Sequence, residues 1–109
     1  MQRKSKKVYL MKFTVKLTDE AKKDYAGLTP DQQDLLQDDY EIISNIGLDS
    51  INFNSLDKNL FEIKTKDLRS IFDYRKGQII LVAVIFIKNS QKTPKNIIER
   101  AKKILKKYP

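Results

Sequence analysis

The sequence contains no cysteine and no histidine among its 109 residues. The lack of cysteine excludes a disulfide, a thiolate metal site and a cysteine nucleophile. The lack of histidine removes the usual acid–base group of neutral pH and the commonest metal ligand. Any proton transfer near pH 7 must therefore use another kind of group.

Long apolar segments are lacking as well. The longest apolar run is IILVAVIFI at residues 79–87, which is too short to cross a bilayer as a helix. The basic start MQRKSKK is followed only by VYLM, which is too short for the apolar core of a signal peptide. The length suits one domain over residues 1–109. We expect a single cytoplasmic domain without a membrane partner.

Charge is plentiful but unevenly distributed, with a formal net charge of +8. Residues 1–16 contain six basic and no acidic residues, and residues 17–62 contain three basic and eleven acidic ones. Residues 63–109 contain thirteen basic and three acidic residues. Clustered positive charge is typical of proteins that bind polyanions such as nucleic acids. A solvated surface on a lysine-rich protein gives the same pattern.

The first half of the chain predicts a strand followed by two helices. β-branched and aromatic residues favour a strand over residues 7–17. Thr18 is a helix N-cap, and Gly27 ends that helix. The sequence TPDQ at residues 29–32 is a capping box with proline at the first helical position, and it opens a helix that ends near Gly47.

The second half predicts three strands and a last helix. After a polar loop at residues 48–59, strands are expected at residues 60–65, 68–75 and 78–88, and Thr93 caps the final helix. The order is β-α-α-β-β-β-α. This order indicates an α+β fold, in which a small antiparallel sheet packs the αα-hairpin against one face.

Two cations are predicted to face each other in the hairpin EIKTKDLRS. A two-residue turn at residues 66–67 places Lys64 directly opposite Arg69, where like charges destabilise a sheet. A similar turn at residues 76–77 would place Arg69 opposite Val84. A phosphate bound between the two cations would offset their repulsion, because arginine supplies a planar fork and lysine a mobile charge.

The same sheet face is expected to carry Phe86 and Lys88, together with Ile80 and Val82. The other face, which should meet the helices, is expected to carry Leu81 and Ala83. An aromatic ring beside cations that bind phosphate can stack an unpaired base of RNA. Two alternatives stay open: Phe86 can belong to the core, and the cations can pair with carboxylates and only solubilise the face. The candidate carboxylates are Glu62, Asp67 and Asp73.

The acidic residues between positions 31 and 41 fit the solvated side of a helix. A carboxylate metal site among them is a minor alternative. These residues are Asp31, Asp34, Asp38, Asp39 and Glu41.

The motifs LFEIKTKDLRSIFDY, IILVAVIFIKNSQKTP and NIIERAKKIL, in this order, resemble the RelE/ParE toxin superfamily. The resemblance is to its HigB-like, phage-derived Gp49-like branch, and it covers roughly residues 58–107. It implies a type II toxin that cleaves messenger RNA on the ribosome through attack of the ribose 2′-OH, without a metal or other cofactor. It also implies a cognate antitoxin, often of the helix-turn-helix type.

The resemblance also implies which residues form the site. Arg69 and Lys64 occupy the basic positions of its two strand motifs, and Phe86 and Lys88 match its F-x-K motif. Asn89 and Val84 depart from the pattern, which often has a second basic residue and a histidine there. The expected catalytic residues are Arg69, Lys64 and Lys88, and the expected RNA-binding residues are Phe86, Lys92, Lys66 and Lys95.

Two other functions remain compatible with the resemblance. Members of the ParE type bind and poison DNA gyrase without cutting RNA. A toxin remnant that binds RNA without cleaving it would fit Asn89 and the missing histidine.

Overall fold

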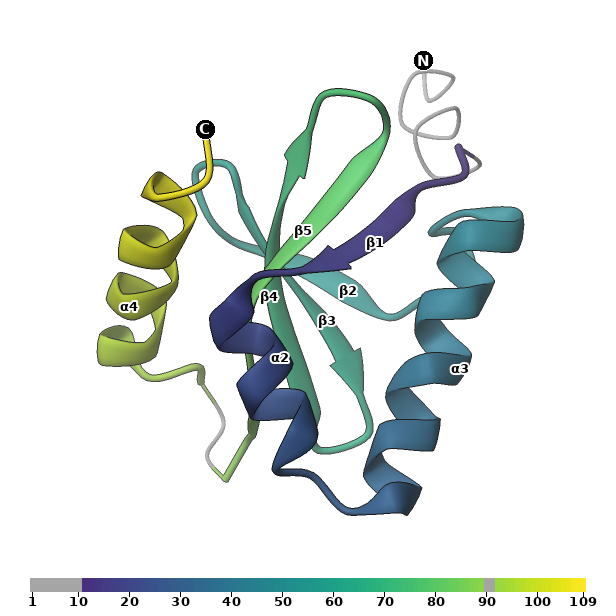
Figure 1. Ribbon diagram of the computed structural model, residues 1–109, viewed down its shortest axis with the longest axis horizontal. Helices are drawn as coiled ribbons and strands as arrows, with labels where there is room; N and C mark the ends of the chain where they lie inside the picture. The colour runs from purple at the N-terminus through teal and green to yellow at the C-terminus, as the bar shows by residue number, and fades with distance from the viewer. Residues whose placement is uncertain (1–10, 90–91) are drawn as a thin grey trace.

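A computed structural model describes residues 11–89 and 92–109 of the chain (Figure 1). It confirms the α+β fold: a five-stranded sheet in the order β1-β5-β4-β3-β2, with three helices. Residues 7–10 of the expected first strand lie outside the described residues. The elements are β1 (Thr14–Leu17), α2 (Asp19–Ala26), α3 (Pro30–Ile46), β2 (Phe53–Asp57), β3 (Leu60–Thr65), β4 (Leu68–Arg75), β5 (Ile79–Ile87) and α4 (Lys95–Lys106).

The first two helices begin where the sequence predicts. The Thr18 Oγ1 atom accepts a hydrogen bond from the Ala21 N–H at 3.0 Å and so satisfies a free donor of the first turn of α2. In α3 the Thr29 and Gln32 side chains form the reciprocal bonds of a capping box. Gly47 follows α3 with a φ of 98°, a conformation that favours glycine.

The sheet differs from the prediction in two respects. Residues 53–57 form a strand, β2, which pairs antiparallel with β3, so the expected loop at 48–59 is wrong over these residues. This edge strand is mostly polar, and the free edge of β3 rather than an apolar alternation decides its pairing. In addition, β1 runs parallel to β5, so the sheet is mixed and not purely antiparallel.

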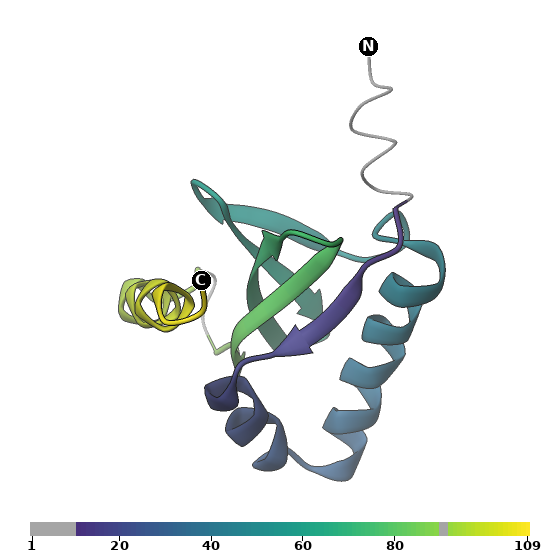
Figure 2. The same cartoon turned by 45° about the horizontal axis from the view of Figure 1, so that its top comes forward.

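Helices cover both faces of the sheet. The α2–α3 hairpin packs on one face, as predicted, and its core includes Leu36, Ile43 and Phe72. The helix α4 packs on the opposite face, so the expectation that this face carries no helix is wrong (Figure 2). Its apolar side, with Ala101 and Ile104, buries the middle of that face. Of the described residues on this face, those in its middle are therefore closed to a ligand.

The register of β4 against β5 also differs from the prediction. Their turn has three residues, since Arg75 pairs with Ile79, and a bulge follows between Ile71 and Phe72. Each irregularity shifts the register by one residue, so Arg69 pairs with Phe86 and not with Val84. Two shifts restore the side-chain alternation at the Arg69 end, and the predicted common face of Arg69 and Phe86 is confirmed.

Before the bulge the alternation along β5 is reversed. Leu81 and Ala83 were expected on the αα-hairpin side, but they pack with the residues of α4. Ile80 and Val82 were expected on the opposite face, but they pack with the core of the αα-hairpin. The bulge lies inside a run of apolar residues, so the sequence pattern carries no mark of it.

Side chains of α2 satisfy the edge of β5 where β1 ends. The strand β1 pairs with β5 only as far as Val82. Beyond that point the Thr18 hydroxyl donates to the Ala83 carbonyl at 2.9 Å, and the Asp24 carboxylate accepts from the Ile85 N–H at 3.0 Å. These bonds satisfy buried backbone groups without another strand. In the described part of the chain, no helix is long and apolar enough to cross a membrane.

Candidate RNA-binding site

Lys64, Arg69 and Phe86 lie side by side on three neighbouring strands. The registers pair Lys64 with Arg69 and Arg69 with Phe86, so the three residues form one row across β3, β4 and β5. We call this set the cation row. All three side chains are half-buried. The predicted opposition of two like charges is therefore confirmed, and an aromatic residue completes the row.

The Arg69 side chain turns toward the β3–β4 turn. Its Nη1 atom donates to the carbonyl oxygens of Lys66 at 2.6 Å and of Leu68 at 2.9 Å. These carbonyl dipoles offset part of the repulsion from Lys64, but they do not neutralise the guanidinium. The buried Nε atom has no hydrogen-bond acceptor among the described residues. Arg69 thus keeps its full charge, and an anion could replace the carbonyl contacts.

The carboxylates that could have neutralised the row are engaged elsewhere or do not reach it. Asp73 pairs with Arg75 at 2.7 Å. Glu62 accepts a hydrogen bond from the Thr93 hydroxyl. Over residues 11–89 and 92–109, neither Lys64 nor Arg69 forms an ion pair with any acidic side chain. The alternative in which these cations only pair with carboxylates is therefore wrong for this part of the chain.

Glu62 is a buried carboxylate next to the cation row, only 1% exposed. It lies two residues before Lys64 on β3, and its bond to Thr93 ties the segment before α4 to the sheet. Thr93 was predicted as the N-cap of α4, but Pro94 holds that position, and the Thr93 side chain serves β3 instead. The Thr93 hydroxyl thus donates to a distant carboxylate and does not accept from a local N–H as an N-cap would.

Two hydrogen bonds from α3 hold the hairpin from its other face. The Thr65 hydroxyl donates to Asp39 at 2.6 Å, and the Tyr40 hydroxyl and the Ser70 hydroxyl are 2.7 Å apart. Burial raises the pKa of Tyr40 well above its usual value, so this hydroxyl keeps its proton. Asp39 was predicted to lie on a solvated face, but it is half-buried. These positioning contacts join residues far apart in the chain, so no local sequence pattern predicts them.

The remaining predicted residues surround the row. The Lys88 N–H donates to the Asp67 carbonyl at 2.7 Å, which fixes the end of β5 beside the β3–β4 turn. Lys66, in that turn, is exposed and has a φ of 57°, which is uncommon outside glycine. The exposed residues Lys92 and Lys95 flank the start of α4, and the Thr93–Glu62 bond brings this segment beside β3.

The two residues that depart from the family motif, Asn89 and Val84, lie in different surroundings. Asn89 is exposed directly after Lys88, whereas Val84 is buried and pairs with Ile71. Val84 therefore lies under the sheet surface covered by α4, two residues from Phe86 along β5. No cluster of three or more carboxylates in the described segments could hold a metal ion, so the minor alternative of a carboxylate site on α3 has no support there.

Comparisons with known proteins agree with this architecture. The family of phage-derived Gp49-like proteins (DUF891) matches residues 25–106. Among curated proteins no sequence matches this chain. One solved structure of similar fold is the toxin–antitoxin complex RelBE2 from Mycobacterium tuberculosis, with a TM-score of 0.60 and 14% identity, covering 72% of this chain and all of that one.

A second solved structure is the archaeal RelE–RelB complex from Pyrococcus horikoshii OT3. Its chain has a TM-score of 0.59 and 14% identity, and the match covers 74% of this chain and 100% of that one. At this identity the two structures demonstrate a common fold, whereas the family match spans most of the sequence. The chain therefore belongs to the phage-derived Gp49-like family and has the RelE-like fold, as its motifs predict.

Proposed function

We propose that this protein is the toxin of a type II toxin–antitoxin system and cleaves messenger RNA on the ribosome, in the cytoplasm. The observation that carries the proposal is the cation row, in which Lys64 and Arg69 face each other without a carboxylate partner among the described residues. Such a pair stabilises a bound phosphate, and Phe86 beside it can stack a base. Family membership and the fold give independent support.

The reaction follows from the chemistry of RNA. The ribose 2′-oxygen attacks the adjacent phosphorus and forms a new O–P bond, while the bond from phosphorus to the 5′-oxygen breaks. The 2′-OH proton passes to a base, and the leaving 5′-oxygen takes up a proton. The products are a 2′,3′-cyclic phosphate and a 5′-hydroxyl. This route needs no metal ion.

The proposed roles follow from charge and position. Arg69 stabilises the extra negative charge that develops on the non-bridging phosphate oxygens, because preorganised cations act most strongly where new charge appears. Lys64 and Lys88 hold the phosphate and carry protons. Lys66, Lys92 and Lys95 contact the RNA on either side.

A cognate antitoxin, of the helix-turn-helix type, is the proposed partner besides the ribosome and its messenger RNA. The two solved structures of similar fold are a toxin–antitoxin complex and a RelE–RelB complex. Co-expression of the neighbouring reading frame should abolish growth arrest and yield a stable complex. Growth arrest that persists with every neighbouring frame would contradict this partner.

Primer extension on cellular messenger RNA after induction of the protein tests the main proposal. We expect cuts at preferred positions within codons, and loss of these cuts in Arg69→Ala. Broken DNA with intact messenger RNA would instead support gyrase poisoning, and RNA binding without cleavage would support an inactive remnant. Either result would overturn the proposed nuclease.

A further inference from the structure

A second basic region lies at the other end of the sheet face that carries the cation row. A hollow of about 410 Å³ is bordered by the β2–β3 turn, the end of β4 and the last turns of α4. We call it the α4 hollow. Asp73 is the carboxylate among the described residues that line it. Its lining cations are Lys58, Arg75, Lys102 and Lys106.

Two of these cations are neutralised within the protein. Arg75 pairs with Asp73 at 2.7 Å, and Lys102 pairs with Asp57 at 2.5 Å. The pair with Lys102 also lowers the pKa of Asp57 below its usual value, so this carboxylate stays ionised. The ion-paired Arg75 and Lys102 therefore line the hollow but add little net positive charge to it.

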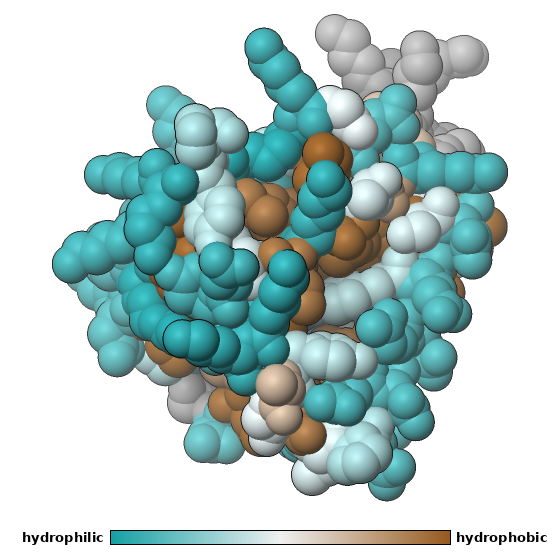
Figure 3. Space-filling model, viewed as in Figure 1, coloured by the Kyte–Doolittle hydropathy of each residue, from teal (hydrophilic) through white to brown (hydrophobic). Residues whose placement is uncertain are grey.

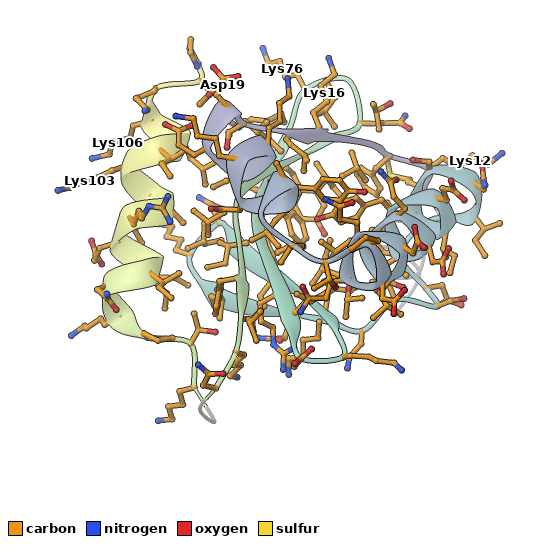
Figure 4. All side chains as sticks on the ribbon, turned by 60° about the horizontal axis from the view of Figure 1, so that its bottom comes forward. Lys12, Lys16, Asp19, Lys76, Lys103 and Lys106 are labelled. Carbon is orange, nitrogen blue, oxygen red and sulfur yellow. The ribbon has the colours of Figure 1, made fainter. Side chains whose placement is uncertain are left out.

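The other two cations are uncompensated. Lys58 and Lys106 are exposed, and neither forms an ion pair with any described residue. Lys103 projects from the outward side of α4 beside Lys106 (Figure 4). In the space-filling view, hydrophilic residues cover this outward side of α4 (Figure 3). The rim of the hollow thus presents positive charge to the solvent.

The floor of the hollow is apolar. Leu60 and Leu105 line it, and they are 3% and 7% exposed. Cations above an apolar floor suit a ligand with alternating anionic and apolar parts, as in a polynucleotide, where phosphates alternate with riboses and bases. A simple anion would need only the charges.

The hollow and the cation row lie on the same face of the sheet. Leu60 and Lys64 are four residues apart on β3, and Arg69 and Arg75 are six residues apart on β4. The strand rise makes these separations about 13 Å and about 20 Å. In a strand with stacked bases, successive nucleotides rise by about 3.4 Å along the axis, so four to six nucleotides would span the distance.

We infer that the α4 hollow is a second phosphate-binding site, which holds the RNA strand where it leaves the cation row. This inference rests on the proposed function. The positive rim selects a polyanion. Because α4 covers the middle of the sheet face, the strand would follow the hydrophilic outward side of α4, which runs from the segment bound to Glu62 on β3 to the hollow. The acidic helix α3 lies on the other side of the sheet and repels such a ligand from there.

The experiment compares a double variant with a control of equal charge change. Lys58→Gln with Lys106→Gln removes the two free cations of the hollow. Lys12→Gln with Lys22→Gln removes two exposed cations elsewhere, and Lys12 lies far from α4 in Figure 4. The probes are a trinucleotide and a strand of about 12 nucleotides, both 2′-O-methylated to prevent cleavage, and fluorescence anisotropy reports binding over a series of salt concentrations.

We expect the hollow variant to bind the longer strand about fivefold more weakly, with a salt slope smaller by about 0.7 for each lost phosphate contact. Its binding of the trinucleotide, which covers only the cation row, should stay unchanged. The control should change both affinities by less than about twofold. Equal losses in the hollow variant and the control would overturn the inference, because net charge would then explain them.

Two further arms separate competing explanations. If the hollow variant loses binding of a hexaglutamate peptide but keeps its affinity for the longer RNA, the hollow serves an acidic protein segment and the inference is wrong. Arg69→Ala tests the proposed nuclease by itself. Cleavage that survives in Arg69→Ala would remove the catalytic proposal, while a selective loss of long-strand binding in the hollow variant would still establish the second site.

Discussion

Arg69 and Arg75 lie on the same strand and the same sheet face, yet their surroundings differ. The Arg75 guanidinium pairs with Asp73 and donates to the carbonyl oxygens of Leu105 and Tyr108, so it caps the end of α4. Within the described part of the chain, the Arg69 guanidinium donates to the carbonyl oxygens of Lys66 and Leu68. The comparison shows that a basic residue marks a candidate site by its unsatisfied charge and not by its presence in a basic segment.

The largest expected effect is the loss of cleavage in Arg69→Gln. Without the guanidinium, cleavage in a ribosome assay should fall by at least about 100-fold, because a preorganised donor that stabilises new charge is lost. The melting temperature should change little, since the lost contacts join a half-buried side chain to its own turn. A variant that melts early and cleaves normally would reverse the assignment.

Arg75→Gln should show the opposite behaviour. Its charged hydrogen bonds to the end of α4 are partly buried, so we expect a loss of about 2 kcal/mol in the free energy of unfolding, measured with urea. Cleavage per folded molecule should fall far less than in Arg69→Gln. Lys76→Gln, at the exposed turn next to Arg75, is the matched control and should match the wild type.

Tyr40→Phe removes a hydrogen bond from α3 to Ser70, the residue next to Arg69 on β4. Removal of the hydroxyl leaves buried Ser70 without this partner and should lower the free energy of unfolding by about 1 kcal/mol at pH 7. The wild-type protein should also lose stability as pH rises above about 10, because the unfolded tyrosine ionises there while the folded one, with its raised pKa, does not. Tyr40→Phe should lack the loss of stability that comes from ionisation of Tyr40. Urea titrations at pH 7 and above pH about 10 measure the free energy of unfolding of both proteins.

The smallest effect is expected for Lys66→Gly. The change removes a cation next to Arg69 but suits the turn, because a φ of 57° is easily adopted by glycine. Stability should stay within about 0.5 kcal/mol of the wild type, since relief of the strained φ offsets the greater freedom of the unfolded chain. RNA binding should weaken slightly, with a smaller salt slope. A large loss of cleavage would make Lys66 a central residue rather than a flanking one.

The candidate site could be predicted in part from local rules. The two-residue turn and the alternation along β3 and β4 place Lys64 opposite Arg69, and both depend on neighbours in the sequence. Phe86 was assigned to the correct face for an incomplete reason, because the two register shifts add up to two residues and so keep the side-chain alternation. The contacts from Asp39 and Tyr40 and the Glu62–Thr93 bond could not be predicted, since each joins residues about 25 or more positions apart.

The sequence by itself determined the helices, the N-caps of α2 and α3, three of the strands and the family, because these depend on residue type and short-range spacing. The tertiary structure decided which cations keep a free charge. Arg69 and Arg75 are alike in sequence, but the carbonyl oxygens at the end of α4 accept hydrogen bonds from Arg75, whereas Arg69 donates to carbonyl oxygens of Lys66 and Leu68. The tertiary structure also decided that β2 pairs with β3 and that β1 pairs with β5. Strand pairing satisfies backbone N–H and C=O groups, and the side-chain pattern does not show which strands meet.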